Sequence, residues 1–159
     1  MKVTAQEEYG IRCMMQLARV GPERAPTLED IAKLEGISEP YVAKLLHRLS
    51  RKGLVTSTRG RRGGYALARP ASQIRMYEVF EALGQPFFES PSYCQTHVGA
   101  LDVCAHTGDC SLRSLLRAMN TVIVQILRNT RLSDLASCNE RGMDDTLHTV
   151  HVTRSAASV

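Results

Sequence analysis

The chain has 159 residues, of which 43% are hydrophobic, and carries a net charge of +4. This composition excludes disorder over most of its length and fits one compact domain, or a small domain with an appendage. No apolar run is long enough to span a bilayer, and the N-terminus lacks the hydrophobic region of a secretion signal. We therefore expect a cytoplasmic protein with no membrane partner and no structural disulfides.

The charges are unevenly distributed along the chain. Residues 1–70 hold 13 basic and 7 acidic side chains, whereas residues 71–159 hold 7 basic and 9 acidic ones. A solvated charged surface would mix the two signs. The asymmetry instead predicts that the first half meets nucleic acid.

Three helices are predicted in the first third of the chain. Apolar residues recur at helical spacing over residues 3–20. A second helix begins at Thr27, with Asp30 as a capping-box partner and an apolar face formed by Leu28, Ile31, Ala32 and Leu34. After a tight turn at Gly36, Ser38 is expected to cap a third helix, whose inward residues are Val42, Leu45, Leu46 and Leu49. Two short helices joined by a glycine-containing turn predict a helix-turn-helix.

A β-hairpin is predicted directly after the third helix. Gly53 ends that helix, and residues 54–57 and 65–68 have the composition of two short strands. Three glycines are expected to supply positive backbone dihedrals at the tip: Gly60, Gly63 and Gly64. The hairpin therefore forms a wing beside the helix-turn-helix.

The stretch from Pro40 to Tyr77 contains no Asp or Glu. Its basic residues are Lys44, Arg48, Arg51, Lys52, Arg59, Arg61, Arg62, Arg69 and Arg75. A cationic surface without carboxylates suits a polyanion, because each Lys or Arg that neutralises a phosphate releases condensed counterions. The candidate groove contacts are the third-helix residues off its apolar stripe: Glu39, Tyr41, Lys44, His47 and Arg48. At the wing tip, Arg59 is expected to enter the minor groove, and Arg61 and Arg62 are expected to contact phosphates.

The second half of the chain predicts a loop followed by a long helix. Residues 76–83 form a short helix that stops at Gly84, and residues 85–110 read as a loop. From Ser111 one continuous apolar stripe begins: Leu112, Leu115, Leu116, Met119, Val122, Ile123, Ile126 and Leu127. We expect residues 111–138 to form a dimerisation helix region, with packing inside one chain as the alternative, and residues 139–159 to be a disordered tail.

Three of the five cysteines lie in the predicted loop: Cys94, Cys104 and Cys110. Thiolates are the favoured ligands of iron–sulfur centres, which tolerate one other ligand. The Cys-x-x-Cys pair of most structural zinc sites is absent, although zinc held with a histidine and a metal-free thiol switch remain alternatives. Cys13 is expected to be a core residue, and Cys138 has no predicted role. No base–nucleophile arrangement or phosphate-binding glycine motif accompanies the thiols, so we expect no enzyme activity.

Taken together, these motifs resemble the winged helix-turn-helix regulators that include IscR, NsrR, RirA and CymR. The resemblance is carried by Gly36-Ile37-Ser38 leading to Tyr41, Lys52-Gly53-Leu54-Val55, Arg59-Gly60, Gly63-Gly64-Tyr65, Ala68-Arg69-Pro70 and the three-cysteine loop ahead of the long helix. It implies a mainly α fold with a small β-hairpin wing. It also implies a cytoplasmic homodimeric transcription factor. The helix from Ser38 would enter the major groove of a palindromic operator, residues 1–84 would form the DNA-binding domain, and residues 85–110 would bind the cofactor.

The resemblance implies that this cofactor is an iron–sulfur cluster. Members with three loop cysteines bind a [2Fe–2S] or [4Fe–4S] cluster that changes their DNA affinity, and other members respond to other signals. This chain departs from the IscR-like pattern in two ways: nine residues separate Cys94 from Cys104, and Arg113 replaces a histidine ligand. In the NsrR-like pattern the other subunit supplies an acidic ligand, a place that Glu8 occupies here, and His97 and His106 are local alternatives.

The sequence therefore predicts a DNA-binding transcriptional regulator, a repressor or an activator, of genes that respond to iron, redox state or nitric oxide. Its operator affinity would be controlled by the cluster. The alternative is the same DNA-binding fold acting as a thiol-redox or zinc-dependent regulator without a cluster.

Overall fold

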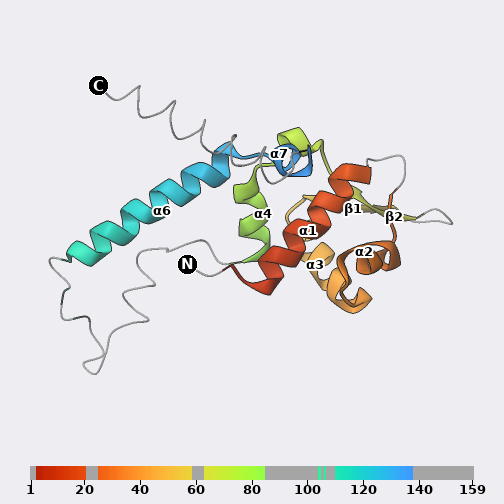
Figure 1. Ribbon diagram of the computed structural model, residues 1–159, viewed down its shortest axis with the longest axis horizontal. Helices are drawn as coiled ribbons and strands as arrows, with labels where there is room; N and C mark the ends of the chain where they lie inside the picture. Colours follow the sequence, from red (N-terminus) through yellow and green to blue (C-terminus); the bar gives the residue numbers. More distant parts are fainter. Residues whose placement is uncertain are drawn as a thin grey trace. The chain divides into compact units, whose positions relative to one another are not determined.

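The computed structural model describes residues 3–20, 25–58, 63–84, 104, 106 and 110–137. Its elements are α1 (Ala5–Val20), α2 (Leu28–Glu35), α3 (Glu39–Arg51), β1 (Val55–Thr58), β2 (Gly64–Leu67), the 3₁₀ helix η2 (Ala71–Gln73), α4 (Met76–Leu83), α6 (Ser111–Asn129) and α7 (Leu132–Ser137) (Figure 1). The fold is mainly helical with a two-stranded antiparallel hairpin, as the sequence predicted. None of the described helices is both long and apolar enough to cross a membrane.

The chain divides into two units. The first unit is Met1–Gln85 with Leu127–Val159, and the second is Pro86–Ile126. The predicted disordered tail, residues 139–159, lies outside the described residues, as do the wing tip and most of the predicted loop. The helix-turn-helix and the hairpin belong to the first unit, and the start of α6 belongs to the second.

Helix α1 is the central element of the first unit. It packs against α2, α3, α4, α7 and β2, and Figure 1 shows it between α4 and the α2–α3 pair. Residues three and four apart share one face of a helix, so Cys13, Met14 and Leu17 are buried together, with exposed fractions of 0%, 0% and 2%. A Cβ on Gly10 would lie 2.5 Å from the Leu83 methyl groups. The glycine therefore allows α1 and α4 to approach closely.

Local signals in the sequence position α2 and α3. Thr27 and Asp30 form the predicted capping box, in which the Asp30 N–H donates to Thr27 Oγ1 at 3.2 Å and the Thr27 N–H donates to Asp30 Oδ2 at 2.9 Å. Gly36, with φ of 66°, ends α2 and turns the chain into α3. Ser38 takes the N-cap position of α3, but its side chain makes no capping hydrogen bond.

The apolar face of α3 is as predicted, and that of α2 differs at one residue. The inward residues of α3 are all 0% exposed: Val42, Leu45, Leu46 and Leu49. On α2, Ile31 and Ala32 are buried, whereas Leu34 is 59% exposed. The expectation for Leu34 is wrong because Ile31 and Glu35, four residues apart, define the buried side of this short helix.

The wing is a hairpin of β1 and β2, paired antiparallel from Val55 opposite Leu67 to Thr58 opposite Gly64. Relative to the predicted strands, β1 begins one residue later and β2 one residue earlier. Both shifts extend the pairing towards the tip. Gly60 and the three tip arginines are outside the described residues.

Gly64 has a different role from the one predicted. It lacks a positive φ, since Gly36 and Gly53 are the glycines with positive φ among the described residues. Instead, a Cβ at Gly64 would lie 2.4 Å from the Ala25 carbonyl oxygen. The next residue, Tyr65, donates its N–H to the Pro26 oxygen at 2.9 Å. Glycine is therefore needed because the segment before α2 docks directly against β2.

The predicted helical region of residues 111–138 is interrupted after Asn129. At the break, the Met76 N–H donates to the Thr130 oxygen and the Leu132 N–H donates to the Ile74 oxygen, both at 2.9 Å. Leu132 is 0% exposed in the core of the first unit. The end of this region is therefore part of the helix-turn-helix unit. The apolar pattern did not reveal the break, because Leu132 and Leu135 continue a helical spacing across it.

Replacing Leu132 with Ala is expected to lower the free energy of unfolding by about 2–5 kcal/mol, because the truncation leaves a cavity in the core. The matched control is Leu34→Ala, which removes the same atoms from a side chain that is 59% exposed. That change is expected to stay within about 0.5 kcal/mol. Urea denaturation followed by circular dichroism measures both. Equal losses in the two variants would show that α7 does not pack into the core.

Candidate DNA interface and thiol site

The outward face of α3 presents most of the predicted DNA contacts to solvent. Five of the six are exposed: Ser38, Glu39, Lys44, His47 and Arg48. The sixth, Tyr41, is half-buried and packs against the core. Two further cations at the end of the helix, Arg51 and Lys52, are exposed as well, and their adjacent positions in the sequence were the signal for them.

Within the part of the chain that the structure describes, none of the four exposed cations forms an ion pair with a carboxylate: Lys44, Arg48, Arg51 and Lys52. Glu39 is the acid on the same helix. The face of α3 can therefore offer its positive charges to phosphates.

Two other basic residues of the acid-free stretch are used inside the protein. Arg69 forms an ion pair with Glu78 of α4, and Arg75 Nη1 donates to the Asn129 oxygen at 3.5 Å. The Arg75 N–H also donates to Glu78 Oε2 at 2.9 Å. Burial alone would raise the pKa of Glu78, but the Arg75 N–H and the Arg69 guanidinium outweigh it, so that pKa is lowered. Arg69 and Arg75 thus hold the end of the wing to α4.

Several predicted site residues lie outside the described residues. They are Arg59, Arg61 and Arg62 of the wing tip and Cys94 and His97 of the loop. Their roles remain predictions. The strands that lead to the tip are described, and they place it after Thr58 and before Gly64.

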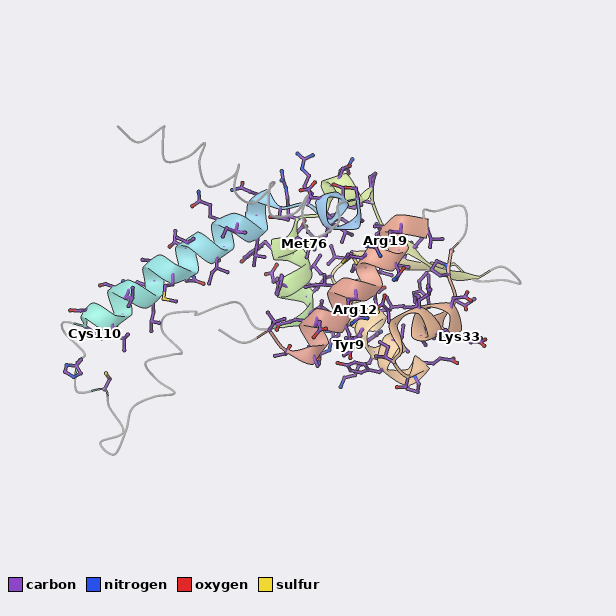
Figure 2. The ribbon with its side chains drawn as sticks, in the orientation of Figure 1. Tyr9, Arg12, Arg19, Lys33, Met76 and Cys110 are labelled. Carbon is purple, nitrogen blue, oxygen red and sulfur yellow. The ribbon has the colours of Figure 1, made fainter. Side chains whose placement is uncertain are left out.

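Cys110 lies immediately before α6, at the N-terminal end of that helix (Figure 2). The Ser114 N–H donates to the Cys110 carbonyl oxygen at 3.3 Å, and the Arg113 N–H donates to Cys110 Sγ at 3.4 Å. The sulfur therefore occupies the place of an N-capping side chain. The Arg113 N–H thereby satisfies one hydrogen-bond acceptor position of this sulfur.

The second described loop thiol, Cys104, is also free and partly exposed. Arg113, which replaces the histidine of the IscR-like pattern, donates from Nη2 to the His106 carbonyl oxygen at 3.2 Å. The guanidinium thus ties the loop to α6. Iron–sulfur clusters are held mainly by cysteine thiolates, and Cys104 and Cys110 are free thiols of that kind within the described part of the chain.

Glu8 lies in the first unit, whereas Cys104 and Cys110 lie in the second. Its carboxylate is 58% exposed and pairs with Arg12 at 3.6 Å. Among the described residues, no group of three or more His, Cys, Asp or Glu side chains gathers as a metal site. That search covers two of the three loop cysteines, since Cys94 is outside it.

Comparison with known proteins identifies the family. Residues 3–137 match the model of the Rrf2 family, described as iron-dependent transcriptional regulators. The chain belongs to this family. The resemblance drawn from the sequence motifs is thus confirmed.

Three similar proteins illustrate the match. Protein aau3 of Rhizobium meliloti (strain 1021) is 33% identical over 135 residues, which are 85% of this chain and 84% of that protein. The structure of CymR, the global cysteine regulator of B. subtilis, has a TM-score of 0.71 at 28% identity and covers 88% of this chain and 99% of its own. The structure of T. potens IscR has a TM-score of 0.67 at 29% identity and covers 85% of each chain.

The cysteines differ in their surroundings, and their reactivity is expected to differ accordingly. Burial, with a smaller effect of Glu35, raises the pKa of Cys13 to about 12. At pH 8 about one Cys13 thiol in ten thousand is then ionised, and only the thiolate reacts with iodoacetamide. Reduced, metal-free protein should therefore be alkylated at Cys104 and Cys110 long before Cys13.

Peptide mass mapping of a time course checks this order, and labelling in urea is the control. Because only the thiolate reacts, the rate of Cys13 labelling in the folded protein should rise about tenfold for each pH unit below that pKa. Rapid labelling of Cys13 at pH 8 in folded protein would contradict its burial in α1.

Proposed function

We propose that this transcriptional regulator binds operator DNA through α3 and the wing, under the control of an iron–sulfur cluster held by Cys94, Cys104 and Cys110. The observation that carries the cluster part is the free Cys110 thiol, whose sulfur accepts the Arg113 N–H at the start of α6. The DNA part rests on the exposed cations Lys44, Arg48, Arg51 and Lys52, which form no ion pair with any described carboxylate.

Helix α3 is the proposed reader of the major groove. Its exposed face carries the groove and phosphate contacts Ser38, Glu39, Lys44, His47 and Arg48, supplemented by Arg51 and Lys52. The wing would place Arg59 in the neighbouring minor groove, where the negative potential is enhanced, with Arg61 and Arg62 on phosphates. Because Arg69 and Arg75 are bonded inside the unit, we assign them no DNA contact.

When bound, the cluster supplies a centre that responds to oxidants, iron supply or nitric oxide. The chain supplies the thiolates, and the fourth ligand is Glu8 of a partner subunit, His97 or His106. Glu8 suits the role because its exposed ion pair with Arg12 is long and therefore easily exchanged. Arg113 bonds the His106 backbone oxygen rather than its ring, which leaves that imidazole available as the local alternative.

The two solved structures named above support different branches of the proposal. The likeness to IscR supports a cluster, whereas the likeness to a global cysteine regulator supports the alternative, a thiol-based regulator on the same fold. A thiol switch would use the same two free cysteines, Cys104 and Cys110, and would need no metal.

Anaerobic purification decides between these branches. Wild-type protein is expected to be brown or red and to contain iron and sulfide. The single variants Cys94→Ser, Cys104→Ser and Cys110→Ser should each lose the colour, because each removes one thiolate ligand. Cys13→Ala is the matched control, since Cys13 is buried in the other unit, and it should keep the cluster.

DNA binding is measured in parallel with a duplex that the wild-type protein selects from a random-sequence library. Loss of the cluster is expected to change its affinity about tenfold or more, within the usual range of coupling between two sites. A colourless protein that contains zinc, or that contains neither iron nor zinc, would contradict the proposal that the protein binds an iron–sulfur cluster. Failure to select any duplex would overturn DNA binding itself.

We also propose that α6 forms a homodimer. Its 19 residues include no buried side chain, and its stripe is exposed at Leu112 (56%), Leu115 (57%), Met119 (43%) and Val122 (46%). Apolar residues at this spacing on one helix face form a seam that a second copy can cover. Two copies would also present two α3 helices to the half-sites of a palindrome.

Replacing Leu115 with Glu should break this dimer, because it buries a charge in the apolar seam. Sedimentation equilibrium is expected to show twice the 17.6 kDa chain mass for the wild type and the single mass for the variant. Thr121→Glu is the matched control and should remain dimeric, because Thr121 is exposed and lies three or four residues from no member of the stripe. A Leu115→Glu variant that keeps the wild-type mass would contradict the proposed seam.

A further inference from the structure

Side chains outside the apolar core join α1 to the two helices of the helix-turn-helix near the start of α3. Tyr41 is the third residue of α3, and its ring packs edge-to-face on Tyr9 of α1, with centroids 6.2 Å apart and an interplanar angle of 78°. Both rings are partly buried against the core. This contact links the first turn of the recognition helix directly to α1.

Tyr9 is itself held in place from its other side. The Arg12 guanidinium lies 5.2 Å from the centre of the Tyr9 ring, and Figure 2 shows the two side chains at neighbouring positions on α1. Arg12 Nε donates to Glu35 Oε2 at 2.6 Å, and Gln16 Nε2 donates to Glu35 Oε1 at 2.6 Å. Glu35, the last residue of α2, has a side chain that is 4% exposed.

The contacts among Tyr9, Arg12, Glu35 and Tyr41 restrict how these four side chains can be arranged. Both oxygens of the buried Glu35 carboxylate are bonded by α1, and breaking such a pair leaves an uncompensated buried charge. Arg12 is therefore restrained by Glu35, and its guanidinium lies over the Tyr9 ring. The Tyr9 ring in turn meets Tyr41 in the edge-to-face arrangement that aromatic pairs favour. As a result, α1 holds both sides of the turn at Gly36, through Glu35 before it and Tyr41 after it.

We propose that Tyr41 is a positioning residue, which acts on DNA by fixing the start of α3 against Tyr9 of α1 and not by contacting the duplex. This inference rests on the proposed role of α3 as the recognition helix. Hydrogen bonds to base edges are short and directional, so a small rotation of α3 removes several of them together. Attraction to phosphates acts over a longer range and changes little.

If Tyr41 has this role, its replacement should weaken the discrimination between DNA sequences without changing the attraction to phosphates. Affinity for the selected duplex should fall, while affinity for a scrambled duplex of the same length and the salt dependence should not. A phosphate contact would behave in the opposite way, lowering both affinities and the salt slope. A contact through the hydroxyl group would be lost in Tyr41→Phe.

The test measures both affinities, over a range of salt concentrations, for Tyr41→Phe, Tyr41→Leu, Tyr9→Leu and the Tyr9→Leu/Tyr41→Leu double variant. Tyr41→Phe is expected to bind like the wild type, because the ring contact is kept. Each single Leu variant should lose about three- to tenfold in affinity for the selected duplex, the range expected for one aromatic pair. The double variant should lose no more than the larger single change, because both remove the same contact.

Lys44→Ala is the matched control on the same helix, and it should weaken both duplexes and lower the salt slope by about one unit. Unchanged binding to the scrambled duplex shows that the Leu variants are folded, and a melting curve confirms it. If the Leu variants unfold, the Tyr41→Phe result and Tyr9→Phe still decide the question, since both must retain the wild-type ratio of the two affinities.

A loss in Tyr41→Phe equal to that in Tyr41→Leu would overturn the inference and assign a hydroxyl contact with DNA. Wild-type affinity in Tyr9→Leu combined with a loss in Tyr41→Leu would overturn it as well. Neither result would affect the proposed function, which fails only if the wild-type protein selects no duplex.

Discussion

The first unit depends on the burial of one face of α1. Cys13, Met14 and Leu17 lie at its centre, and the other elements of the unit pack around this helix. The close approach to α4 needs Gly10, although glycine inside a helix costs about 1 kcal/mol relative to alanine. The helix-turn-helix is therefore assembled against α1, and Arg12 and Gln16 of that helix bond both carboxylate oxygens of Glu35, the residue before the turn.

The positions of the carboxylates decide which basic residues form ion pairs inside the protein and which remain free to contact phosphates. Glu78, one residue beyond the acid-free stretch, takes Arg69 as its ion-pair partner and accepts the Arg75 N–H. Glu35 similarly engages Arg12. No described carboxylate pairs with the cations of α3, so their positive charge stays available where α3 meets solvent. A regulator that approaches a polyanion needs this division, because stray acids on the contact face repel phosphates.

The thiol site and the DNA-binding unit are connected through the chain at both ends of the second unit. Leu83 is the last residue of α4, and Gln6 Nε2 of α1 donates to its backbone oxygen. The chain returns at Leu127, and Arg128 then lies over the Tyr77 ring of α4 at 4.8 Å. Helix α4 thus bonds to α1 through Leu83 and contacts Arg128 through Tyr77.

The sequence by itself determined the order of the helices, the capping box at Thr27, the turn at Gly36, the buried face of α3 and the family, because each depends on residues that are close in the chain. Only the tertiary structure decided that Gly64 is needed for a close approach to Ala25, that Leu132 enters the core and that Leu34 does not. It also showed that Arg69 is bonded to Glu78 inside the protein whereas Lys44 is exposed, and that Tyr41 packs on Tyr9 whereas the other predicted DNA contacts of α3 are exposed. These distinctions depend on which partner lies across the fold, and hydrophobic spacing along one helix carries no information about a partner that is distant in the chain.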